Sequence, residues 1–165
     1  MGQVIRFTAL PRAERVAPRT LNEAERLLLS AVRNWVAAFR RAERALPRLC
    51  LDMALAGVHD AAFSVDALMG ILVRTARRTV EIHCPGCASL SDDERCLLHA
   101  AALAQAGERA RAEEALCGAL LTAPGAAFAL GPIVGLGELF AIGGLFFPRR
   151  VRPRGTRATP SRQHH

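Results

Sequence analysis

Three cysteines and one histidine lie close together in the middle of the chain. They are Cys84, Cys87, Cys96 and His99, in the pattern Cys-x2-Cys-x8-Cys-x2-His. Thiolate and imidazole are preferred ligands of Zn²⁺, and four of them complete a tetrahedral site with no open position. The pattern therefore predicts a structural zinc site at these four residues, with folding coupled to metal binding.

Local structure has to bring the two halves of this set together. The sequence Cys84-Pro85-Gly86-Cys87 is typical of a tight turn in which two thiolates can converge on one ion. Cys96 and His99 are three residues apart on a predicted helix, so their side chains leave from the same face. His83 is an alternate fourth ligand. It adjoins Cys84, however, and neighbouring residues rarely point at one ion, so His99 is favoured.

Two other kinds of chemistry fit the same residues. Three cysteines and a histidine can hold an iron–sulfur cluster, and Cys84 and Cys87 alone can form a redox-active dithiol. A catalytic dithiol normally opens a helix in a βαβ unit, and the sequence shows no such pattern. Unliganded packing of Cys96 is also possible, because cysteine is often a core residue. Zinc is the leading interpretation, and a redox protein is the alternative.

The charge of the chain is concentrated at its two ends. The formal net charge is +7 and all 22 basic residues are arginines. Residues 1–19 carry +3 and residues 148–165 carry +6, which leaves −2 for residues 20–147. A basic recognition face on the central part is therefore not expected. The ends could make weak contacts with nucleic acid or an anionic membrane, and their arginines are Arg6, Arg12, Arg15, Arg19, Arg149, Arg150, Arg152, Arg154, Arg157 and Arg162.

Helical periodicity and capping signals dominate the central part. They predict a mostly α-helical fold: a compact bundle of about five to six helices with a short Cys-rich knuckle loop. A capping box at Thr20 and Glu23 starts the first helix, which ends near Pro47, and a capping box at Ser91 and Glu94 starts the fourth. The other helices are expected at 48–57, 64–78, 109–121 and within 115–147, and short extended segments at 3–7 and 80–82. We expect a basic arm at 1–19, one helical domain at 20–147 and a disordered Arg-rich tail at 148–165.

The stretch 115–147 is the most apolar part of the chain, and Glu138 is its only charge. Its length allows a membrane span, which makes a small membrane-associated protein another alternative. Proline and glycine, at Pro124, Gly125, Pro132 and elsewhere, are expected to divide it into shorter pieces. Helices of a soluble core are therefore the favoured interpretation.

Common catalytic motifs are missing from the sequence. It has no phosphate-binding glycine loop, no serine nucleophile elbow and no zincin helix motif. The closed ligand set then favours a zinc-stabilised regulatory or protein-interaction module without catalytic activity. Another protein is the expected partner, and no small-molecule substrate is inferred. Residues 1–19 lack an apolar run of signal-peptide length, which favours a cytoplasmic location.

Overall fold

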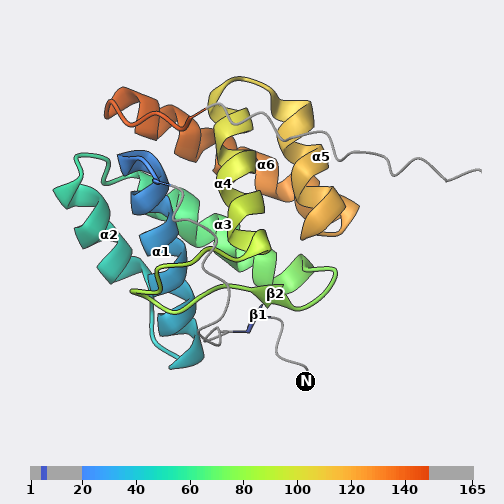
Figure 1. Cartoon of the computed structure of the whole chain (residues 1–165), viewed down its shortest axis with the longest axis horizontal. Coiled ribbons are helices and arrows are strands. Elements are labelled where there is room, and N and C mark those ends of the chain that lie inside the picture. Colours follow the sequence, from blue (N-terminus) through green and yellow to red (C-terminus); the bar gives the residue numbers. More distant parts are fainter. Residues whose placement is uncertain (1–4, 7–19, 149–165) are drawn as a thin grey trace, which may run out of the picture.

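The structure, a computed structural model, describes residues 5–6 and 20–148. This part of the chain forms six α-helices and a two-stranded parallel sheet (Figure 1). The prediction of a compact, mostly α-helical bundle with a cysteine-containing loop is confirmed. Apart from Ile5 and Arg6, the predicted arm and the Arg-rich tail lie outside the described residues. The elements are β1 (Ile5–Arg6), α1 (Glu23–Arg40), α2 (Leu46–Leu55), α3 (Ala61–Thr75), β2 (Val80–Glu81), α4 (Asp92–Gln105), α5 (Arg109–Ala119) and α6 (Ala123–Ile142).

The N-cap of helix α1 lies two residues after the predicted one, at Asn22 instead of Thr20, and the helix ends earlier than predicted. Asn22 is the N-cap, and its side chain accepts a hydrogen bond from the Glu25 amide while the Glu25 carboxylate accepts one from the Asn22 amide. The reciprocal pair satisfies two free amides of the first turn, as a Thr20–Glu23 pair would have done. Pro47 does not end α1. It lies in the first turn of α2, where its missing N–H costs no helical hydrogen bond.

The core is formed mainly by the packing of α3 and α6 against each other, with the α4–α5 hairpin covering α6. Its largest fully buried side chains are leucines, isoleucines, two methionines and one phenylalanine, Phe140. Trp35 of α1 is also buried, and its indole Nε1 donates a hydrogen bond to Asp66 Oδ1 at 2.7 Å. This bond satisfies the one polar atom of the ring inside the core.

Helix α6 corrects the expectation that proline and glycine divide the apolar stretch. It is one helix of 20 residues, with Pro124 in its first turn and Pro132 inside it. Proline in the first turn is well tolerated, and burial of apolar side chains along the helix offsets the cost of Pro132. Among the described helices, α6 is the one long and apolar enough to cross a membrane. It packs against α3, α4 and α5, as a core helix does.

The segment between α3 and α4 carries the cysteine turn and is fixed at both ends. Val80 and Glu81 pair in parallel with Ile5 and Arg6, so the expected extended segments form a minimal sheet. Beyond the turn, Ser91 caps α4 in a complete capping box with Glu94, as predicted. Residues 82–90 are therefore held between a strand and a capped helix, beside α1 (Figure 1).

Candidate functional site

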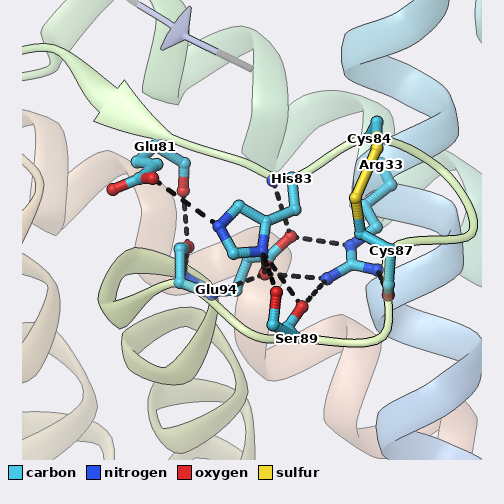
Figure 2. The surroundings of a disulfide bond; sticks show 8 residues. Arg33, Glu81, His83, Cys84, Cys87, Ser89 and Glu94 are labelled. Carbon is cyan, nitrogen blue, oxygen red and sulfur yellow. Dashed lines mark hydrogen bonds and ion pairs between the residues drawn. A yellow bond between two sulfur atoms is a disulfide. The ribbon is translucent and has the colours of Figure 1, made fainter. Parts of the chain in front are cut away.

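Cys84 and Cys87 are joined by a disulfide across a tight turn (Figure 2). Their Cα atoms are 5.6 Å apart, and the Cys87 amide donates a hydrogen bond to the Cys84 carbonyl at 3.1 Å. Gly86 has a φ of +84°, and Pro85 precedes it. Proline followed by a residue with positive φ is the sequence that a type II turn requires. The turn thus brings the two cysteines together, with Pro85 and Gly86 exposed and both cysteines half-buried.

A buried arginine from α1 holds the backbone of this loop. Arg33 is 4% exposed, and its Nη1 donates to the Cys87 carbonyl at 2.6 Å while Nη2 donates to the Ser89 carbonyl at 2.7 Å. Its Nε and Nη2 also donate to the two carboxylate oxygens of Glu94, at 2.7 and 3.0 Å. This bidentate pair places a planar donor group under the loop (Figure 2).

Glu94 connects the loop with the start of α4. The carboxylate is 1% exposed, and besides Arg33 it accepts hydrogen bonds from the amides of His83 and Ser91, at 3.0 and 2.9 Å. Four donors therefore surround one buried charge, which satisfies its oxygens and offsets the cost of desolvation. The result is a rigid junction between α1, α4 and the loop.

His83 is 2% exposed and belongs to the same network. Its Nδ1 lies 3.0 Å from the Ser89 carbonyl oxygen, and its Nε2 lies 3.6 Å from Glu81 Oε1. Ser89 Oγ lies 3.3 Å from the same Nδ1. The two ring nitrogens thus face oxygen atoms of Ser89 and Glu81, and the role of His83 as alternate zinc ligand stays a prediction.

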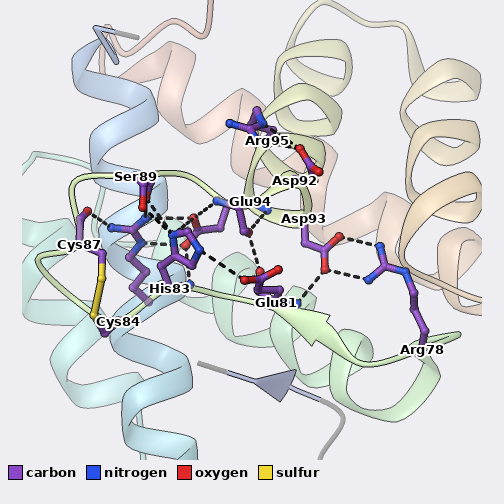
Figure 3. A network of polar contacts seen from close by, with 12 residues as sticks. Arg78, Glu81, His83, Cys84, Cys87, Ser89, Asp92, Asp93, Glu94 and Arg95 are labelled. Carbon is purple, nitrogen blue, oxygen red and sulfur yellow. Dashed lines mark hydrogen bonds and ion pairs between the residues drawn. A yellow bond between two sulfur atoms is a disulfide. The ribbon is translucent and has the colours of Figure 1, made fainter. Parts of the chain in front are cut away.

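A second ion pair, between Arg78 and Asp93, lies where the loop leaves β2 (Figure 3). Arg78 donates to both carboxylate oxygens of Asp93, at 2.9 and 2.6 Å, and the Glu81 amide donates to Asp93 Oδ2 at 2.7 Å. Burial raises the pKa of the Asp93 carboxyl, but the hydrogen bonds from Arg78 and Glu81 outweigh it, so that the pKa lies below its ordinary value. Asp93 therefore remains ionised at neutral pH.

The structure separates the two halves of the predicted ligand set. Cys84 and Cys87 lie in the turn, whereas the Cys96 thiol donates to the Ala115 carbonyl of α5 at 3.4 Å. His99 lies one turn further along α4. Within residues 20–148 no three His, Cys, Asp or Glu side chains form a group suited to a metal ion. A zinc or iron–sulfur site that includes Cys96 would require its thiol to leave α5, and such a site stays a prediction.

Arg33 is a site residue that the sequence analysis did not identify. Its spacing carried a signal. Arg33 lies four residues after Leu29 and three before Val36, both of which are buried, so it shares their helical face. An arginine on an apolar face indicates a buried partner for its charge.

A disulfide between two half-buried cysteines across an exposed turn can undergo thiol–disulfide exchange, and the surrounding hydrogen bonds can keep the turn intact while it does so. Comparison of the chain with protein-family models, with curated proteins and with solved structures finds no match.

Proposed function

We propose that the protein is a redox protein that exchanges dithiol and disulfide at Cys84 and Cys87. The observation that supports this most directly is the disulfide in an exposed turn whose backbone is held by groups other than the sulfur atoms. After reduction, the Pro85-Gly86 turn and the Arg33 hydrogen bonds would still keep the two thiols adjacent. Reoxidation would then be an intramolecular step, which proximity accelerates.

The exchange is a two-electron reaction with two thiol groups, which a dithiol partner supplies as follows. A thiolate of the partner attacks one sulfur of the Cys84–Cys87 disulfide, the S–S bond breaks, and the other cysteine leaves as a thiolate and takes up a proton. The second thiolate of the partner then attacks its own sulfur in the mixed disulfide and releases the remaining cysteine. The partner dithiol is oxidised to a disulfide, and Cys84 and Cys87 are reduced.

Redox titration of the full chain tests this proposal. With increasing dithiothreitol, site-resolved alkylation should show Cys84 and Cys87 becoming reduced together and reversibly. The Cys84→Ser variant should lose the exchange but keep its helical circular dichroism. Closing so short a loop contributes no more than about 2 kcal/mol to stability, so the variant should remain folded.

Metal analysis of the same samples separates the redox proposal from the zinc prediction. Structural zinc would contribute on the order of 10 kcal/mol to folding, so Cys84→Ser would unfold a zinc-dependent chain. The matched control is Cys96→Ala, which should leave the exchange unchanged. About one equivalent of zinc or iron that disappears in Cys96→Ala would overturn the redox proposal, as would a disulfide that dithiothreitol cannot reduce.

A further inference from the structure

A pocket of about 240 Å³ lies between the N-terminal half of α1 and the cysteine turn. Its apolar wall includes Leu21, Leu29 and Leu90, and its polar groups include Arg26 and Ser30. This volume is below the range of pockets for drug-sized ligands. It suits a ligand of the size of a modified amino acid or one end of a short peptide.

The pocket reaches only one of the two sulfur-bearing residues. Cys87 is among the described residues that line it, together with Pro85 and Gly86, whereas Cys84 is not. A nucleophile bound in the pocket therefore lies beside Cys87 and not beside Cys84. Which sulfur is attacked determines which cysteine becomes the leaving group, and here the leaving group is Cys84.

The pocket also carries one positive charge that the surrounding protein does not neutralise. Arg33 lines it too, but its charge is matched by Glu94. Arg26 is exposed and donates through Nη1 to the Leu21 carbonyl at 2.8 Å, and no carboxylate in the described part of the chain pairs with it. Its guanidinium has further N–H groups that can bind a carboxylate.

We infer that this pocket receives a small thiol that carries carboxylate groups and that reacts with Cys87. The inference rests on the proposed exchange at Cys84 and Cys87, and it names the class of reactant, which the sequence had not indicated. The thiolate attacks the Cys87 sulfur, a new S–S bond forms, and the bonding pair of the old disulfide leaves with Cys84, which takes up a proton. A second small thiol then attacks the sulfur of the bound thiol and releases Cys87, so that two thiols become one disulfide as the protein gains two electrons.

Single-cysteine reactivity toward oxidised glutathione tests the inference. In Cys84→Ser, the thiolate of Cys87 attacks glutathione disulfide and releases one glutathione; in Cys87→Ser, only Cys84 of the pair can do so. Peptide mapping after acid quenching should show the mixed disulfide forming about tenfold faster at Cys87 than at Cys84, because the pocket reaches Cys87 alone. Equal rates at the two cysteines would overturn the inference.

Removing the positive charge of Arg26 gives a second, independent test of the inference. Within the Cys84→Ser chain, adding Arg26→Gln keeps a donor for Leu21 and removes the charge. It should slow the reaction with glutathione disulfide about threefold, the size expected of one exposed charge, and raising the salt concentration should reduce this effect. Arg26→Lys should restore most of the rate. The reaction with the neutral bis(2-hydroxyethyl) disulfide should change less than about twofold, and an equal slowing of both disulfides would count against carboxylate recognition.

The exchange function and the pocket inference would be overturned by different results. If dithiothreitol reduces the native disulfide but Cys84 and Cys87 react alike with glutathione disulfide, the exchange function stands and the pocket inference falls. If dithiothreitol does not reduce the native disulfide, the exchange function itself falls.

Discussion

Two regions of the bundle, the cysteine turn and helix α6, are held in place by different forces. Around the cysteine turn, a buried arginine and a buried glutamate bind backbone carbonyls and amides of a loop. Along α6, small residues let apolar helices approach closely, and Gly125 and Gly137 lie where a Cβ would meet Thr75 and Gln105. Directional hydrogen bonds fix the position of a loop that has little core of its own, whereas close packing is the main contact between α6 and the helices beside it. The reactive cysteines lie in the hydrogen-bonded region.

Breaking the buried ion pair between Arg33 and Glu94 should lower the stability of the protein most. Arg33→Met leaves Glu94 as a buried charge without its main partner, so we expect the free energy of unfolding to fall by about 3–5 kcal/mol. Urea denaturation measures the loss. The double variant Arg33→Met/Glu94→Gln removes the stranded charge and should recover part of it. A loss below about 1 kcal/mol in the single variant would mean that the loop does not depend on this pair.

Adding a methyl group to α6 at Gly125 tests the close packing of this helix. The Cβ of Gly125→Ala would lie 2.5 Å from the Thr75 Cβ and closer still to its hydroxyl, so the helices must move apart. We expect a loss of about 1–3 kcal/mol in thermal or urea unfolding. The matched control is Gly135→Ala on the same helix, where the nearest atom, Ser64 Oγ, would lie at an ordinary contact distance of 3.5 Å. That variant should gain about 0.5–1 kcal/mol through helix propensity, and equal effects at both positions would contradict close packing.

The Arg78–Asp93 pair should give a smaller, pH-dependent effect. Because the pKa of Asp93 is lowered in the folded chain, its contribution is complete well above pH 4 and is lost as the pH falls below about 4. Arg78 is half-exposed, so Arg78→Gln should cost about 1 kcal/mol at pH 7.

The pH dependence separates this pair from an ordinary surface contact. The difference between the wild type and Arg78→Gln should shrink as acid denaturation is followed from pH 5 to about pH 2. Arg48→Gln, at the exposed pair with Asp52 on α2, is the matched control, with an expected change within about 0.5 kcal/mol. A difference that stays constant down to pH 2 would contradict the role of the Asp93 charge.

The smallest effect is expected at Cys96. Its thiol donates a weak hydrogen bond to the Ala115 carbonyl. Cys96→Ala should therefore cost no more than about 1 kcal/mol in urea denaturation. Loss of the fold in this variant would instead favour the zinc prediction, because a metal ligand contributes far more than a packed thiol.

Several elements could be predicted from local patterns alone. The Ser91–Glu94 capping box placed the start of α4, and Pro85-Gly86 placed a tight turn between the two cysteines. Both depend on interactions among residues less than five positions apart, which the sequence displays directly. The prolines of α6 were misjudged, because their local cost is visible in the sequence and the burial that offsets it is not.

The sequence by itself determined a helical chain with two cysteines across a turn, because periodicity, caps and turn residues act locally. Only the tertiary structure decided that Arg33 reaches this turn from α1 and that Cys96 faces α5 instead. A side chain's partner depends on how helices rotate and cross, and that orientation follows from packing of the whole core. For this reason three cysteines with the spacing of one metal site lie apart, Cys84 and Cys87 in the turn and Cys96 against α5.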